Sequence, residues 1–232
     1  MTTVTTDKIY RVKEAFYTLQ GEGTHAGRPA VFCRFSKCNL WNGKEDGRAA
    51  ATCQFCDTDF VGTDGQNGGR YSKDELCSLL RDLWPNSDVS PFIVCTGGEP
   101  ALQLDGTLVE AMHKQGFEIA IETNGTLPLP EGIDWICLSP KENSDVILQQ
   151  CHELKLVYPQ PGAMPDQFRH IEATHRYLQP MDMTAIRQSP AREHIPLFAP
   201  QDTDPVQAAV HYCLANPEWK LSVQTHKWIG ID

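Results

Sequence analysis

Apolar positions along the chain fall into short runs rich in β-branched and aromatic residues, separated by longer segments with scattered apolar positions. Short runs of this kind, bounded by turn residues, are typical of buried strands. They predict strands over residues 30–36, 92–96, 117–122, 134–138, 153–158, 176–181 and 219–224. The longer segments between them predict helices over residues 73–84, 104–115, 143–151, 165–174 and 203–215.

Two of these helices are preceded by residues that favour a helix start. Ser72 can cap the first helix, and Glu75 is placed to complete a capping box. Asp202 or Thr203 precedes the last helix, and Pro205 falls near its first turn. Both helices are therefore expected to begin at these positions.

Strands that alternate with helices predict βαβ units and a mostly parallel sheet. About six such strands fit either an open doubly wound sheet or an incomplete (β/α) barrel, and the periodicity does not separate the two. In both folds, ligands bind at the carboxyl ends of the strands. Polar or glycine-rich sequences follow predicted strands at residues 36–38, 97–99, 122–125, 139–141 and 224–227. We therefore expect one site at this edge of the sheet.

Composition and charge narrow the class of protein. The 232 residues, 41% of them hydrophobic and 22% charged, suffice for one well-packed domain, which we expect over residues 1–232. No apolar run approaches the roughly 20 residues that span a bilayer, and the N-terminus lacks a secretory signal, so a cytoplasmic protein is expected. A net charge of −10 without a cluster of basic residues argues against nucleic-acid binding and favours a small-molecule or protein partner.

Nine cysteines, an odd number, argue against a disulfide framework in a cytoplasmic protein. Those that stand singly in apolar stretches are predicted to be small buried side chains, and they are Cys33, Cys77, Cys95, Cys137, Cys151 and Cys213. The others are spaced differently, since 14 residues separate Cys38 from Cys53 and two separate Cys53 from Cys56. A C-x-x-C pair can direct both thiolates at one metal centre, and a third cysteine just past a strand can complete the set.

This spacing by itself leaves the identity of the metal open. A structural zinc site needs a fourth protein ligand, for which Cys33 or His25 could serve. An iron–sulfur cluster with three cysteine ligands instead leaves one iron open to bind another molecule. A zinc-stabilised binding module therefore stands beside an enzyme as an alternative.

The segment from Thr96 to Pro100, TGGEP, ends a predicted buried strand. Together with the three cysteines, it resembles the radical S-adenosylmethionine (SAM) superfamily. The resemblance implies an incomplete TIM-like (β/α) barrel of about six mostly parallel strands, in which these cysteines hold a 4Fe–4S cluster and SAM binds the open iron. It also implies that Gly97, Gly98 and Glu99 contact SAM, since glycines let backbone approach a ligand and a carboxylate accepts from its amino group.

The cysteine spacing departs from the C-x3-C-x2-C pattern that is common in the superfamily. Residues 39–52 form a longer loop, rich in Gly, Asn, Asp and small residues, and this insertion is expected to leave the surface without disturbing the ligands. It leaves open the shape of the cover over the cluster and the way in which a reductase docks.

A narrower resemblance, to the 7-carboxy-7-deazaguanine synthase family, runs nearly end to end. It is carried by residues 16–23 (FYTLQGEG), 34, 56–58 (CDT), 94–100, 121–125 (IETNG), 138–141 (LSPK) and 222–227 (SVQTHK). It implies a lyase that contracts 6-carboxy-5,6,7,8-tetrahydropterin to 7-carboxy-7-deazaguanine with loss of ammonia, toward queuosine and related deazapurines. It further implies regenerated SAM, Mg²⁺, a flavodoxin or ferredoxin-type electron donor and a homodimer.

The same resemblance implies roles for individual residues. The pterin is expected to contact Gln20, Glu22, Arg34, Thr96, His226 and the terminal carboxylate of Asp232. SAM is expected to contact Gly97, Gly98, Glu99, Glu122, Thr123, Asn124, Ser139 and Lys141. Thr58 is expected to join the magnesium shell. For Arg34, an internal salt bridge is an alternative, since an unpaired guanidinium on an apolar strand is costly.

Catalysis of this kind rests on positioning, so no side chain is expected to act as a catalytic acid or base. Another small radical SAM protein is the alternative within the superfamily, for example an activase that makes a glycyl radical on a partner. Such an activase would need a protein-docking face and no magnesium.

Overall fold

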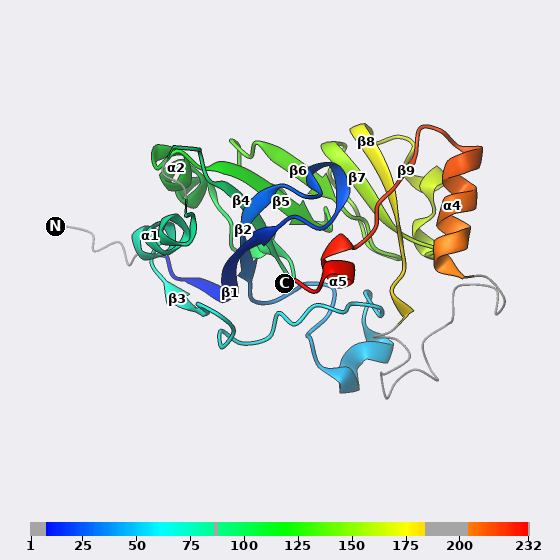
Figure 1. The fold of residues 1–232 in the computed structure, drawn as a ribbon. Helices are drawn as coiled ribbons and strands as arrows, with labels where there is room; N and C mark the ends of the chain where they lie inside the picture. Colours follow the sequence, from blue (N-terminus) through cyan, green and yellow to red (C-terminus); the bar gives the residue numbers. More distant parts are fainter. Residues whose placement is uncertain (1–7, 86–87, 184–203, 232) are drawn as a thin grey trace.

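The computed structural model describes residues 8–85, 88–183 and 204–231. Within these ranges, nine strands form one sheet in the order β3-β1-β2-β4-β5-β6-β7-β8-β9 (Figure 1). The strands are β1 (Tyr10–Leu19), β2 (Pro29–Phe35), β3 (Gly69–Tyr71), β4 (Phe92–Gly97), β5 (Glu118–Thr123), β6 (Trp135–Leu138), β7 (Gln150–Tyr158), β8 (Glu172–Pro180) and β9 (Lys220–Leu221). The α-helices are α1 (Lys73–Leu83), α2 (Gly106–Lys114), α4 (Pro205–Ala215) and α5 (Thr225–Ile229).

The sheet is mostly parallel and open. Strands β2 and β4 to β9 pair in parallel, whereas β1 pairs antiparallel with both β2 and β3. Helices α1 and α2 lie side by side near one end of the sheet, and α4 lies at the other end (Figure 1). The sheet ends at β3 on one side and at β9 on the other, so the barrel does not close. This confirms the expected incomplete (β/α) barrel.

The predicted strands are all present, as β2 and β4 to β9, with ends shifted by a few residues. The helices predicted over 73–84, 104–115 and 203–215 are confirmed as α1, α2 and α4. Ser72 caps α1 as expected, because its hydroxyl accepts from the backbone N–H of Glu75 and the Glu75 carboxylate accepts from the backbone N–H of Ser72.

Helix α4 begins two residues later than the range 203–215 predicted from the sequence. Asp204 is its cap, with a side chain that accepts from the backbone N–H of Val206, and Pro205 is its first residue. The two residues expected to precede the helix, Asp202 and Thr203, lie outside the described residues.

Two of the predicted helices are wrong. The segment 143–149 forms no helix, because the backbone of Ile147 bonds to Gly125 at the end of β5, and β7 begins at Gln150. The helix predicted over 165–174 shrinks to a 3-10 helix at Pro165–Phe168, and β8 then begins at Glu172. Hydrogen bonds to distant strands outweigh local helix propensity in both segments.

Strands β1 and β3 and the short helix α5 were not predicted. Strand β1 contains a bulge between Val12 and Glu14, which breaks its apolar alternation. Its Lys13 is buried, with the ammonium 2.8 Å from carboxylates of Asp59 and Asp64. The bulge and the buried lysine therefore interrupt the apolar alternation from which this strand could have been predicted.

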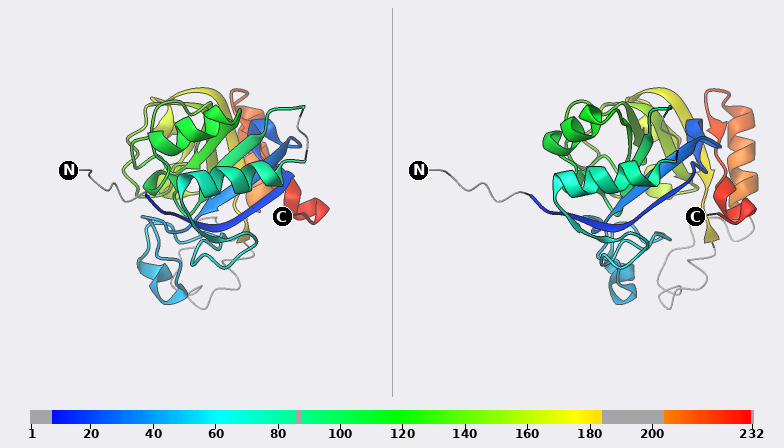
Figure 2. Two further views of the ribbon diagram at one scale, coloured as in Figure 1. Left: turned by 90° about the vertical axis from the view of Figure 1, so that its left-hand side faces the viewer. Right: turned by 60° about the vertical axis from the view of Figure 1, so that its left-hand side comes forward.

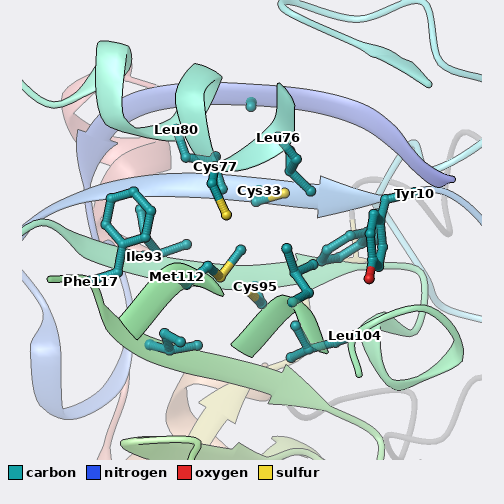
Figure 3. Packing of buried hydrophobic residues seen from close by; sticks show 14 of the residues in the cluster. Tyr10, Cys33, Leu76, Cys77, Leu80, Ile93, Cys95, Leu104, Met112 and Phe117 are labelled. Atoms are coloured by element: carbon teal, nitrogen blue, oxygen red, sulfur yellow. The ribbon is translucent and has the colours of Figure 1, made fainter. Parts of the chain in front are cut away.

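A hydrophobic core fills the layer between the sheet and helices α1 and α2. Figure 3 shows Cys77 and Met112 of these helices beside Cys33 and Cys95 of the sheet in this layer. Because side chains alternate along a strand, Arg34 points to the opposite, inner face of the sheet. The thiols predicted to be buried are so at Cys33, Cys77, Cys95 and Cys137, whereas those of Cys151 and Cys213 are half-buried.

Candidate active site

A cavity of about 400 Å³ lies at the carboxyl ends of the parallel strands. The sequence-predicted residues that line it are Gln20, Glu22, Arg34, Cys38, Cys53, Cys56, Thr58, Thr96, Gly97, Gly98, Glu122, Thr123, Asn124, Ser139, Lys141 and His226. Glu99 is not among the lining residues, and Asp232 lies outside the described residues. The fold thus brings residues from almost the whole chain to one place.

The two glycines at the end of β4 allow two chain segments to meet. A Cβ on Gly97, whose φ is +143°, would lie 2.2 Å from the carbonyl oxygen of Phe35. A Cβ on Gly98 would lie 2.2 Å from the carbonyl oxygen of Lys37 and 2.7 Å from the Cβ of Cys38. Glycine is therefore required for the end of β4 to pack against the turn that carries Cys38.

Glu99 stands behind the cavity wall and is fully buried. Its carboxylate accepts hydrogen bonds from the Thr123 hydroxyl and the Asn124 backbone N–H, both at 2.8 Å, and from the Ala101 backbone N–H at 2.9 Å. Burial raises its pKa, against the opposing effect of these hydrogen bonds. Glu99 thus holds the ends of β4 and β5 in place, and it positions two residues that do line the cavity.

The three cysteines all line the cavity. A hydrogen bond between the thiols of Cys53 and Cys56 raises the pKa of Cys53 and lowers that of Cys56 to about 7. Burial raises the pKa of Cys38, which lies close enough to interact electrostatically with Cys56. Among the described residues, no three His, Cys, Asp or Glu side chains already stand in a metal-binding arrangement. Three thiols around one cavity nevertheless fit a three-thiolate cluster that draws them together on binding.

The two candidates for a fourth zinc ligand lie elsewhere. Cys33 is completely buried in the core on the outer face of β2. The ring of His25 packs against Phe92 and Trp135, with centroids 5.0 Å and 4.4 Å away. Neither residue is on the cavity wall with the three thiols, so the arrangement does not fit a closed four-ligand zinc site.

A buried lysine joins two carboxylates of the cavity. The ammonium of Lys155 lies 2.5 Å from Oε2 of Glu22 and 3.6 Å from Oε1 of Glu122. Burial opposes its charge, but the surrounding anionic groups raise the pKa of Lys155 well above its usual value. Gln20 donates to Oε1 of Glu122 at 3.1 Å, which extends the network toward β1.

The other oxygen of Glu22 accepts from the side-chain amides of Gln179 at 3.1 Å and Gln224 at 2.9 Å. Lys155 and Gln179 were not among the predicted site residues, whereas Gln224 lies in the segment 224–227 that was expected at this edge of the sheet. A lysine within the apolar strand predicted at 153–158 was a signal that could have identified Lys155, because an unpaired ammonium there would be costly.

Arg34 forms the internal salt bridge that was its alternative. Its Nε donates to a carboxylate oxygen of Glu14 at 2.8 Å, and both residues line the cavity. Near the end of β6, the ammonium of Lys141 donates at 2.7 Å to the hydroxyl and to the backbone carbonyl of Ser139. Arg34 and Lys141 therefore add basic groups to the cavity wall beside Lys155.

The C-terminal helix α5 lies against the segments that follow β1 and the cysteines. The backbone N–H of Thr225 donates to the carbonyl of Gly21 at 3.0 Å, and the ring of His226 covers Gly21. The ammonium of Lys227 lies 2.7 Å from Asp57 and 2.5 Å from Asp182. These contacts tie α5 to the loop after Cys56 and to the end of β8.

The open parallel barrel, with three thiols, a glycine turn and polar strand ends around one cavity, defines a radical SAM enzyme. The chain is 54% identical over 223 residues to the 7-carboxy-7-deazaguanine synthase of Bordetella pertussis, a match that covers 96% of this chain and 99% of the relative. The corresponding synthases of Bradyrhizobium diazoefficiens and Burkholderia multivorans are 52% and 49% identical over the same shares. The chain belongs to the 7-carboxy-7-deazaguanine synthase family.

The fold is also that of a solved structure. QueE from Escherichia coli matches 93% of this chain and 94% of its own, with a TM-score of 0.65 and 24% sequence identity. No family model matches the chain. Within the described ranges, no helix is long and apolar enough to cross a bilayer.

Proposed function

We propose that this chain converts 6-carboxy-5,6,7,8-tetrahydropterin to 7-carboxy-7-deazaguanine with loss of ammonia, as a radical SAM lyase. Membership of the synthase family supports this reaction. The observation that supports this cavity as the site of the reaction is the network of Gln20, Glu22 and Glu122 with Lys155. This network presents hydrogen-bond acceptors and donors inside the cavity. Carboxylates and amides of this kind match the donor and acceptor edge of a pterin.

The family implies a 4Fe–4S cluster and SAM, and Cys38, Cys53 and Cys56 would hold the cluster through their thiolates. When bound, the cluster and SAM supply the radical chemistry that removes a hydrogen from the substrate and later returns it. The chain's own residues bind, orient and exclude water. At the SAM end, this role falls to the strand ends at 97–98, 122–124 and 139–141, with Glu99 holding two of them in register.

At the substrate end, Glu22 accepts from the 2-amino group and ring N–H groups of the pterin, and Gln20 donates. Arg34 binds the substrate carboxylate while Glu14 holds its Nε side. Thr96 and His226 complete the wall, on β4 and on α5. A single domain thus carries the whole site, with the insertion at 39–52 beside the cluster.

The proposal includes magnesium, an electron donor and an assembly. Thr58 lines the cavity two residues after Cys56, where its hydroxyl can join substrate oxygens and water around Mg²⁺. The electron donor is a flavodoxin or ferredoxin-type protein, and the active form is a homodimer. A cytoplasmic location fits the cysteines, since all nine are free thiols.

An anaerobic turnover assay after cluster reconstitution tests the function. It contains SAM, Mg²⁺, a reductant and 6-carboxytetrahydropterin, and mass spectrometry follows the products. We expect 7-carboxy-7-deazaguanine without proportional consumption of SAM, and a lower rate when Mg²⁺ is omitted. Cleavage of SAM to 5′-deoxyadenosine without any deazaguanine would leave the class of enzyme intact and show that the substrate is wrong.

A further inference from the structure

The insertion at 39–52 folds around one arginine. It contains a 3-10 helix, Glu45–Ala50, and projects away from the sheet (Figure 2). Within it, Arg48 is only 5% exposed, and its guanidinium lies 4.1 Å from the centre of the Trp41 ring. Its Nε and Nη2 pair with the two carboxylate oxygens of Glu45, at 2.9 Å and 2.5 Å. The buried charge is therefore paired inside the insertion itself.

The remaining edge of this guanidinium reaches the C-x-x-C turn. Its Nη1 donates to the backbone carbonyls of Gln54 at 2.9 Å and Cys56 at 3.0 Å. These carbonyls belong to the short segment that carries Cys53 and Cys56. Arg48 thus links the insertion to the turn that presents two of the three thiols. Only a planar fork of donors can serve a carboxylate and two carbonyls at once, and a lysine cannot replace it.

The guanidinium also places a fixed positive charge close to the thiols. Its hydrogen bonds to Glu45 raise the pKa of Arg48, against the opposing effect of burial, and it interacts electrostatically with Cys56 and Cys53. A nearby cation favours the reduced state of a cluster, which carries one more negative charge than the oxidised state.

We propose that Arg48 is the positioning residue through which the insertion holds the Cys53–Cys56 turn in its cluster-binding conformation and raises the reduction potential of the bound cluster. The insertion then does more than lengthen the loop, because its Arg48 holds the backbone that carries Cys53 and Cys56. The inference rests on the proposed assignment of the cluster to Cys38, Cys53 and Cys56. It assigns no contact between Arg48 and SAM or the substrate.

Two substitutions at Arg48 separate its geometry from its charge. Arg48→Lys keeps the charge and loses the fork, whereas Arg48→Met loses both. The matched control is Arg169→Met, since Arg169 also pairs with an acidic residue three positions away, Asp166 at 2.8 Å, but its side chain is 70% exposed. Each protein is reconstituted and assayed for iron, for the rate of iron loss to a chelator and for the midpoint potential of the cluster.

We expect both Arg48 variants to lose iron roughly 10-fold faster than the wild type, as is typical when a residue that supports metal ligands is removed. The midpoint potential should shift to more negative values in Arg48→Met and stay near that of the wild type in Arg48→Lys. The control should match the wild type in both measurements. Wild-type iron loss and potential in Arg48→Met would overturn the proposal.

Glu45→Gln covers the case in which the Arg48 variants do not fold. The Glu45 side chain is 46% exposed, so this substitution weakens the support of Arg48 without emptying a buried space. It should accelerate iron loss in the same direction but less strongly, and an unchanged rate in both Glu45→Gln and Arg48→Lys would also refute the inference. A Cys53→Ala variant that keeps its full cluster would instead refute the proposed ligands. Absence of deazaguanine from a stably clustered wild type would refute only the substrate.

Discussion

The ammonium of Lys155 and the carboxylate of Glu22 form a 2.5 Å ion pair that joins β7 to the segment after β1. The second oxygen of the same carboxylate accepts from Gln179 on β8 and from Gln224 just before α5. Glu22 is therefore the point where four segments distant in sequence meet on the cavity wall. Removing either member of the pair leaves a buried charge without its main partner.

Replacing Lys155 with methionine should destabilise the fold. The variant leaves Glu22 and Glu122 close together without a counter-ion, and breaking a buried pair in this way costs about 3–5 kcal/mol. Urea unfolding followed by circular dichroism measures the loss. Lys114→Met is the control, because Lys114 forms an ion pair with Glu110 on the surface of α2, and it should change the free energy of unfolding by less than about 0.5 kcal/mol. Equal stability of the two variants would contradict the structural role of Lys155.

Replacing Glu22 with glutamine should impair substrate use as well as destabilise the fold. The amide keeps the shape of the side chain but loses the charged acceptor, and hydrogen bonds to charged groups are worth about 1.5–3 kcal/mol, or roughly 10- to 100-fold in kcat/KM. Steady-state kinetics with 6-carboxytetrahydropterin measure the effect. Glu118→Gln removes a carboxylate that pairs with Arg28 outside the cavity, and it should leave kcat/KM near the wild-type value.

The Glu22 carboxylate should make the fold sensitive to acid. Burial raises its pKa, but the ion pair with Lys155 and the hydrogen bond from Gln224 outweigh burial and lower the pKa to about 2 from its ordinary 4.5. Its contribution to the free energy of unfolding is then complete above pH 4.5 and is lost as the pH falls toward 2.

The same substitution, Glu22→Gln, tests this dependence. Glutamine does not titrate, so wild type and variant should differ more in free energy of unfolding at about pH 6 than at about pH 3. Urea unfolding across this range gives the two values. A difference that stays constant with pH would show that the pKa of Glu22 is not depressed by folding.

Lys227 should control how firmly α5 closes the cavity. Its ammonium bridges Asp57 and Asp182, and the three side chains are about one-third exposed or less. Each such pair contributes roughly 0.2–1 kcal/mol, so the loss of both pairs in Lys227→Met should raise the KM for the pterin by about 2- to 30-fold with little change in Tm. Added salt should raise the wild-type KM toward that of the variant. If the KM of Lys227→Met at low salt equals that of the wild type, the bridge does not hold α5 closed over the cavity.

Local sequence was sufficient to predict an element wherever the residues of that segment by themselves favour it. The run FIVCT reads as a buried strand because β-branched and aromatic residues dominate it, and Ser72 with Glu75 marks the start of α1 whatever the remainder of the chain does. The same holds for the chemistry of the three cysteines and the TGGEP turn, since few other roles suit those residues at that spacing. Polar residues at the ends of the predicted strands indicated a single site. In the structure these segments line one cavity.

Tertiary structure decided the features that depend on distant partners. The segments 143–149 and 165–174 have helix-like composition, yet bonds to β5 and the pairing of β8 with β7 hold them in other conformations. Strand β1 was hidden because its Lys13 is satisfied by Asp59 and Asp64, some 50 positions along the chain. A charged residue in an apolar strand becomes favourable only when the fold supplies its counter-charge.

The same reason separates the predicted from the unpredicted parts of the site. The sequence by itself predicted which residues bind iron, SAM and a pterin, because that prediction rests on the chemistry of each side chain. Only the tertiary structure decided that Lys155 neutralises Glu22, that Arg48 supports the Cys53–Cys56 turn, and that Glu99 stands behind the wall. These roles arise from distances between segments remote in sequence, and burial makes those distances energetically decisive.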